Sequence, residues 1–258
     1  MKKILKALKV NSIIYFILEK LSQIIALFDK ANSLIIPEEL KIRKKTLLDK
    51  KIEALVAEET FEHFKEHFKK SVIFRDISRE KIREYAIEKS LEVDDKNSNK
   101  FYYLEFGVAG GGSSSNFFSK YVNKLFAFDS FEGLIEDWVG TSLPKGYYNQ
   151  NKKIPKLNSN VEPIVGWAEE TIGSFIETHN PKINFIHFDM DTYKSTKLVL
   201  EKTKPFLVKN AILIFDNIYN YAGWENGEFK ALYEVFKENE FDFKAFNLLG
   251  KQIVIQLK

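Results

Sequence analysis

An α/β fold with a largely parallel sheet is predicted by the second half of this 258-residue chain. Short apolar runs alternate there with longer segments of helical spacing, which is typical of parallel strands joined by crossover helices. The last two runs are separated only by NLLG, which is too short for a crossover and indicates a hairpin. We therefore predict a seven-stranded mixed sheet with an antiparallel last strand pair, preceded by a helical N-terminal segment.

The N-terminal segment shows helical spacing from Ile4 to Leu91, with a break expected near 32–37. Its basic, amphipathic start could make a weak peripheral contact with an anionic membrane, but packing on its own domain or in a homo-oligomer explains the pattern better. Glu19 and Lys20 interrupt the apolar stretch that a membrane span needs. The early apolar run is also too short for a signal peptide and lacks a small-residue cleavage site, so a cytoplasmic location is expected.

The polar stretch EVDDKNSNK is expected to link two parts, a helical segment at 1–98 and an α/β domain at 99–258. The absence of cysteine excludes disulfides and thiolate metal sites, and a net charge of +3 indicates no broad nucleic-acid surface. The strands expected in the α/β domain are FYYLEF, KLFAFD, VEPIV, INFIHFD, AILIFD, FDFKAF and QIVIQLK.

A glycine-rich turn, LEFGVAGGGSSS, follows the first of these strands and precedes a helix, as in nucleotide-binding folds. Neither GxGxxG nor GK[ST] occurs in it, and Glu105 at the strand end would repel a pyrophosphate but suit an ammonium group. S-adenosylmethionine carries an ammonium and no phosphate. The residues expected around this cofactor are Glu105, Phe106, Gly107, Gly110 and Ser113.

The next strand ends at Asp129, about 20 residues after the glycines, where a carboxylate can accept the ribose hydroxyls. Asp129 and Ser130 are therefore added to the expected cofactor site, and Asp189, at the end of the fourth strand, is expected to contact the cofactor as well. The alternative is that Asp129 only caps the following turn. The long segment at 130–160 is expected to cover the cofactor and to select the acceptor.

Five blocks in this half resemble the macrocin O-methyltransferase family of class I S-adenosylmethionine-dependent methyltransferases: LEFGVAGGGS, FAFDSFEGL, GWAEET, IHFDMDTYKST and LIFDNIYNYAGWENGEFKA. The resemblance covers roughly 101–258. It implies a Rossmann-like fold and methyl transfer to a hydroxyl of a sugar or related polyol, in bacterial surface-polysaccharide or natural-product biosynthesis. It also implies that Ala168 and Glu169 border the adenine.

Acidic residues end the fourth and fifth strands. In the class I methyltransferase strand order these strands are neighbours, so Asp189, Asp216 and Asn217 would surround one point. Hard oxygen donors of this kind suit Mg²⁺. The resemblance implies metal-binding acids at Asp189 and Asp216, but Asn217 departs from the third acid usual in the family. The alternative is that these acids cap strands and helices without a metal.

The catalytic residues expected are Asp189, as a metal ligand, and either His187 or Asp191 as general base, with Lys194 a weaker choice. A buried structural role for His187 is equally compatible with the sequence. His63 and His67 have metal-compatible spacing but read better as a solvated helical face. The aromatic stretch after the fifth strand could form a lid over the acceptor, although Trp224 could equally belong to the core.

Other functions stay open at this point. The pair Asp189 and Asp191 forms a DxD motif, which is typical of metal-dependent glycosyltransferases. A Rossmann enzyme that uses NAD, a catalytically inactive scaffold, and methyl transfer to a carboxylate or phosphorus-linked oxygen are further alternatives. The leading prediction is an S-adenosylmethionine-dependent, Mg²⁺-dependent O-methyltransferase whose acceptor is a small molecule or a glycan.

Overall fold

The computed structural model describes residues 20, 45–92 and 100–258. The expected first helix, the break near 32–37 and most of the expected linker lie outside these residues. Residues 51–258 form one compact unit by their packing. Residues 51–92 share this unit with the sheet, while a separate helical domain at 1–98 stays a prediction.

One eight-stranded sheet, in the order β1-β7-β8-β6-β5-β2-β3-β4, organises this unit. All seven expected strands are present; β8 is antiparallel to both β6 and β7, and the other pairs are parallel. The bounds are β1 Val72–Phe74, β2 Tyr102–Phe106, β3 Leu125–Asp129, β4 Val161–Val165, β5 Ile183–Phe188, β6 Leu207–Phe215, β7 Phe241–Asn247 and β8 Gln252–Leu257.

The eighth strand, β1, corrects the expectation of seven strands and of helices alone before the linker. It pairs in parallel with β7, with Ile73 opposite Phe246. Three residues are too few to show a two-residue periodicity, and the helical patterns on either side conceal the strand.

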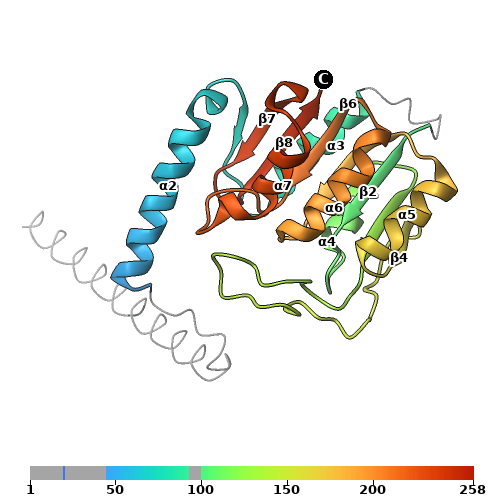
Figure 1. Cartoon of the computed structure of the whole chain (residues 1–258), viewed down its shortest axis with the longest axis horizontal. Coiled ribbons are helices and arrows are strands. Elements are labelled where there is room, and N and C mark those ends of the chain that lie inside the picture. Colours follow the sequence, from blue (N-terminus) through green and yellow to red (C-terminus); the bar gives the residue numbers. More distant parts are fainter. Residues whose placement is uncertain (1–19, 21–44, 93–99) are drawn as a thin grey trace, which may run out of the picture. The chain divides into compact units, whose positions relative to one another are not determined.

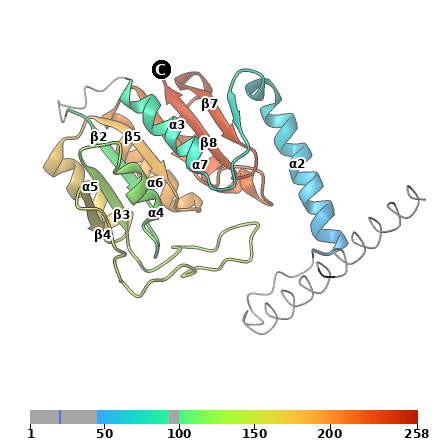
Figure 2. The same ribbon diagram turned by 180° about the vertical axis from the view of Figure 1, so that it is seen from behind.

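Helices cover both faces of the sheet. Figure 1 shows α5, α6 and α7 over one face, and Figure 2 shows α3 and α4 over the other. This three-layer arrangement buries the central strand β5 completely, as expected for a parallel sheet. The helix bounds are α2 Leu47–Phe68, α3 Glu80–Leu91, α4 Ser113–Phe118, α5 Ala168–His179, α6 Tyr193–Thr203 and α7 Glu228–Val235, with 3₁₀ turns η2 Lys204–Phe206, η3 Trp224–Asn226 and η4 Glu238–Glu240.

Aromatic residues dominate the part of the core that supports α2 and the chain after β6. Phe64 of α2 is fully buried, and its ring lies 5.7 Å from Tyr219 and from Trp224 between centroids. Trp224 is itself buried, so the core alternative holds for it; Tyr219 is also buried, which does not fit the expected open lid over an acceptor.

The expectation of a solvated helical face holds in part for the two histidines of α2: His63 is exposed and His67 half-buried, and both also contact neighbouring side chains. His63 packs edge-on against Trp224 and Phe229, and His67 lies 3.9 Å from Glu238. Neither belongs to a metal-ligating group within residues 45–92 and 100–258. Across the part of the chain that the structure describes, every helix is too short or too polar to cross a membrane.

Candidate active site

A cavity of about 630 Å³, including its mouth, opens beyond the carboxyl ends of β2, β3, β4 and β5. Ligands bind at this edge in open α/β sheets. Seven residues expected from the sequence line it: Phe106, Gly107, Asp129, Ser130, Ala168, Asp189 and Asp191. The expected cover at 130–160 contributes Gly133, Leu134, Ile135 and Tyr148.

The glycine turn owes its path to Gly107. This residue has φ +94°, and a Cβ atom on it would lie 2.0 Å from the backbone oxygen of Asp189. The Gly107 amide donates to the Phe128 carbonyl at 2.9 Å, and the Asp189 amide donates to the Phe106 carbonyl at 2.8 Å. Only glycine therefore lets the ends of β2, β3 and β5 meet under the cavity.

Two other residues of the turn do not reach the cavity. Ser113 begins the short helix α4, and Gly110 faces the side chain of Gln150. Neither lines the cavity as the sequence prediction requires for cofactor contact.

Asp129 stabilises the glycine turn through hydrogen bonds with backbone amides. Its carboxylate accepts hydrogen bonds from the amides of Val108 at 2.7 Å, Ala109 at 2.8 Å and Phe131 at 2.6 Å. Asp129 therefore does cap the turn that follows it, as the alternative states. Asp129 also lines the cavity, and a carboxylate has about four acceptor positions, so it can accept further hydrogen bonds from a ribose. That contact stays a prediction.

Glu105 differs from its expected place. Its side chain is fully buried, does not line the cavity, accepts a hydrogen bond from the Ser115 hydroxyl, and lies 2.9 Å from Nδ1 of His187. Both carboxylate oxygens thus have partners within the protein. This arrangement offers no direct contact to a cofactor ammonium in the cavity.

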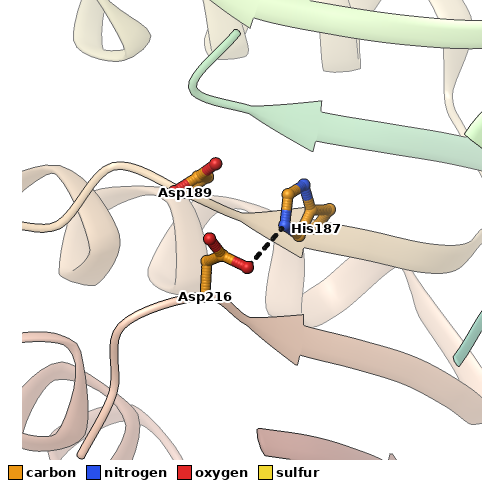
Figure 3. A group of neighbouring side chains, drawn as sticks. All are labelled: His187, Asp189 and Asp216. Atoms are coloured by element: carbon orange, nitrogen blue, oxygen red, sulfur yellow. Dashed lines mark ion pairs between the residues drawn. The ribbon is translucent and has the colours of Figure 1, made fainter. Parts of the chain in front are cut away.

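His187 lies between two carboxylates. Besides Glu105, Asp216 approaches its Nε2 at 3.7 Å, and Figure 3 shows this ion pair, which joins the end of β5 to the end of β6. Burial lowers the pKa of His187, but Asp216 and Glu105 outweigh that effect and raise it to about 9. Both ring nitrogens of His187 face carboxylates, and the side chain does not line the cavity, so the structure favours the structural alternative for His187 over a general base.

Asp216 is surrounded by donors. Arg79 Nη1 pairs with its Oδ2, while Arg83 Nη2 at 3.4 Å and Gln252 Nε2 at 3.0 Å approach its Oδ1. Burial raises the pKa of Asp216, but His187 and the two arginines outweigh burial and hold it well below its usual range. Asp216 is therefore a buried carboxylate with its charge balanced.

Asp191 is the acid best placed to accept a proton. It lines the cavity, and Asn217 Nδ2 donates to its Oδ1 at 2.8 Å. Burial, followed by the neighbouring Asp216, raises the pKa of Asp191 to about 7 despite the hydrogen bond from Asn217. Burial and Asp216 also raise the pKa of Asp189, which lines the same cavity.

The metal-ligating group that the structure forms differs from the expected one. One ligand atom each of His187, Asp189 and Asp216 lies within 4.8 Å of the others (Figure 3). Asn217 instead directs its amide nitrogen to Asp191, and the ring nitrogens of His187 already face Glu105 and Asp216. Two carboxylates remain, which fits Mg²⁺, since it commonly binds through one or two protein carboxylates and keeps several waters.

Several site residues were missed from the sequence. Trp167 and Tyr148 line the cavity; Trp167 stands beside the predicted Ala168, which begins α5, while the predicted Glu169 is exposed and outside the lining. Arg79 and Arg83 were also missed. They lie more than 130 residues before Asp216 in the sequence, so no local sequence pattern indicates their contact with it.

Comparisons with known proteins agree with this architecture. Residues 104–218 match a family model described as a methyltransferase domain. No curated protein matches the chain. Among solved structures, CalS11, a calicheamicin methyltransferase, superposes with a TM-score of 0.58 at 17% identity, covering 82% of this chain and 93% of that chain.

Two further structures behave similarly. The apo structure of CalS11, named as a TDP-rhamnose 3′-O-methyltransferase, gives a TM-score of 0.52 at 17% identity over 82% of this chain and 95% of that chain. The O-methyltransferase NovP gives 0.50 at 15% identity over 70% of this chain and 79% of that chain. The chain therefore has the Rossmann-like fold of these methyltransferases, and residues 104–218 match the model of a methyltransferase domain.

Proposed function

We propose that the protein is an S-adenosylmethionine-dependent O-methyltransferase that acts on a hydroxyl of a sugar or related polyol. The observation that carries this proposal is the cavity beside the glycine turn of a matched methyltransferase domain, with Asp191 on its wall. CalS11, with the same fold, methylates the 3′ oxygen of TDP-rhamnose, which supports a sugar acceptor.

The cofactor would lie between the glycine turn and the start of α5. Gly107 allows close approach to the backbone, and among the residues that line the cavity Asp129 and Ser130 would face the ribose and Trp167 and Ala168 the adenine. The bound sulfonium supplies the methyl group. In this arrangement Glu105 supports the turn indirectly, since it joins α4 to β5 through Ser115 and His187.

Asp191 is the proposed general base. A base works best when its pKa is near the operating pH, and a pKa of about 7 meets that condition. The hydrogen bond from Asn217 fixes one oxygen and leaves the other to receive the proton of an acceptor hydroxyl. Tyr148, from the covering segment, lines the same cavity and would help to exclude water.

Mg²⁺ is the finer part of the proposal. Asp189 and Asp216 are the residues that would hold it. When bound, the cation would lower the pKa of an acceptor hydroxyl. For the cation to reach Asp216, the Arg79 guanidinium must leave Oδ2.

The biological setting is likewise part of the proposal. A role in bacterial surface-polysaccharide or natural-product biosynthesis, a cytoplasmic location and homo-oligomerisation are consistent with the family resemblance. The glycosyltransferase alternative, based on Asp189 and Asp191, is not favoured, because the domain match covers this motif as part of a methyltransferase. Carboxylate and phosphorus-linked acceptors are the remaining alternatives for the acceptor oxygen.

Methyl transfer tests the proposal directly. The full chain is incubated with S-adenosylmethionine carrying a labelled methyl group and a panel of nucleotide sugars, free glycosides, carboxylic acids and phosphonates. Label in an ether linkage on a sugar hydroxyl is the expected result. Label only in carboxylate or phosphonate esters, or transfer of a sugar from a nucleotide sugar, would refute the sugar O-methyltransferase.

A further inference from the structure

The geometry points to Arg79 as an internal cation that competes with a divalent metal ion for Asp216. This inference rests on the proposed metal site and extends it to a residue outside the matched methyltransferase domain. Three observations carry it: the division of contacts between the two oxygens of Asp216, the exposure of the two arginines, and the turn that holds Arg79.

The two oxygens of Asp216 have different partners. Among the contacts within the described residues, Oδ2 is paired with Arg79 Nη1, while Oδ1 receives Gln252 Nε2 at 3.0 Å and also faces Arg83 Nη2 at 3.4 Å and His187 Nε2 at 3.7 Å. Asp189, the other proposed metal ligand, contributes an oxygen within 4.8 Å of the ligand atom of Asp216. Departure of Arg79 alone would therefore free one Asp216 oxygen and leave the other held.

The exposure of the arginines indicates which one can leave. The Arg79 side chain is 38% exposed, whereas that of Arg83 is 10% exposed and that of Asp216 is fully buried. A guanidinium that already reaches water loses little solvation when it moves outward. Arg83 stays behind to balance the buried carboxylate, which would be costly without any counter-ion.

The turn after β1 fixes the backbone of Arg79 and leaves its side chain to move. Asn247 of β7 bonds both the amide and the carbonyl of Asp76, at 3.0 and 2.7 Å. The Asp76 carboxylate accepts the amides of Ser78 at 3.1 Å and Lys81 at 2.9 Å, on either side of Arg79. Arg79 itself has φ +65°, a conformation that a non-glycine residue adopts only when its surroundings impose it.

Charge repulsion makes the two occupancies exclusive. A divalent ion on Oδ2 would need the position that the Arg79 guanidinium holds there, and like charges at that distance in a buried site repel strongly, whereas Arg83 approaches the other oxygen, Oδ1. Binding of the cation at Asp216 therefore requires Arg79 to move away. As long as Arg79 is paired with Asp216, the affinity of the site for the cation is lower than it would be without Arg79.

Binding of Mn²⁺ to the full chain tests this inference without measuring activity. Free Mn²⁺ is followed by electron paramagnetic resonance during titration of the wild type, Arg79→Met and Arg75→Met. Arg75 is exposed and four residues away, so its substitution removes the same charge without removing a contact of Asp216. We expect Arg79→Met to bind Mn²⁺ about tenfold more tightly and Arg75→Met to bind it within about twofold of the wild type.

Unchanged or weaker binding by Arg79→Met would overturn the inference, and so would an equal gain in both variants or no Mn²⁺ binding in any protein. If Arg79→Met does not fold, Arg79→Lys serves in its place. Lysine lacks the planar fork of arginine, so a smaller gain of about threefold is expected. S-adenosylhomocysteine titrated into the same samples separates the two proposals. If it binds normally while Arg79→Met leaves the affinity for Mn²⁺ unchanged, this inference fails and the proposed function stands.

Discussion

Asp191 is the single residue on which the proposed chemistry depends most. Its carboxylate lines the cavity and has a pKa raised to about 7 by burial and by Asp216. Below that pH the group carries a proton and cannot accept another. We expect the rate to rise about tenfold per pH unit below 7 and to level off above it.

Asp191→Asn should lower the rate of methyl transfer by about 10²- to 10⁴-fold and abolish this rise with pH. Binding of S-adenosylhomocysteine, measured by titration, should change little. Asp242→Asn, on the exposed side of β7, makes the same substitution away from the cavity and serves as the control. A variant at position 191 that keeps wild-type turnover would show that another group takes the proton.

Glu105 allows a second test at the scale of one residue. The test distinguishes its predicted contact with the cofactor from the buried contacts that the structure shows. Because the structure pairs it with His187 and Ser115, Glu105→Gln should lower the free energy of unfolding by about 3 kcal/mol. The affinity of the folded variant for S-adenosylhomocysteine should change by less than about threefold. Urea denaturation and calorimetry measure the two effects, and a large loss of affinity with unchanged stability would restore the ammonium contact.

The sequence predicted some site residues better than others, for physical reasons. Gly107, Asp129 and Asp189 follow strands, and strand ends at one edge of a parallel sheet must meet. Whether a side chain at such a place faces the cavity or the interior depends on its partners. Glu105 and His187 pair with each other, and the Arg79 contact with Asp216 depends on a fold that brings distant segments together.

Helix α2 packs on the sheet through a buried aromatic side chain. Phe64 packs among Tyr219, Trp224, Phe243 and Phe246. Phe64→Ala should therefore lower the free energy of unfolding by about 3 to 5 kcal/mol, because it leaves a cavity in the core.

The matched control for Phe64→Ala lies on the same helix. Phe61 is 52% exposed, so Phe61→Ala should cost no more than about 0.5 kcal/mol. Urea denaturation of both variants measures the difference. Equal stability of the two would contradict the packing of α2 on the sheet.

The strands of the sheet were predicted well because their apolar runs are long and their order is constrained. Seven runs and one short hairpin connection were enough for the parallel strands and the antiparallel β8. Strand β1 could not be predicted, since it exists only through its pairing with β7. Its importance is local: the turn that follows it carries Arg79.

The balance of charge in the whole site governs the expected role of a metal. Three aspartates of the site, at 189, 191 and 216, are accompanied by His187 and two arginines. If a divalent cation completes the site, treatment with a chelator should lower methyl transfer by at least about tenfold, and Mg²⁺ should restore it. S-adenosylhomocysteine binding should persist throughout, and full turnover after chelation would remove the metal from the proposal.

The central claim is that the cavity beside the glycine turn binds the methyl donor. Isothermal titration with S-adenosylhomocysteine tests it in the wild type, in Gly107→Ala, and in Gly173→Ala, where an added Cβ atom meets nothing within 4 Å. We expect one site per chain in the wild type and in Gly173→Ala, and binding weakened by about tenfold or more in Gly107→Ala. No binding by the wild type at about 1 mM ligand, or equal binding by all three proteins, would contradict the account.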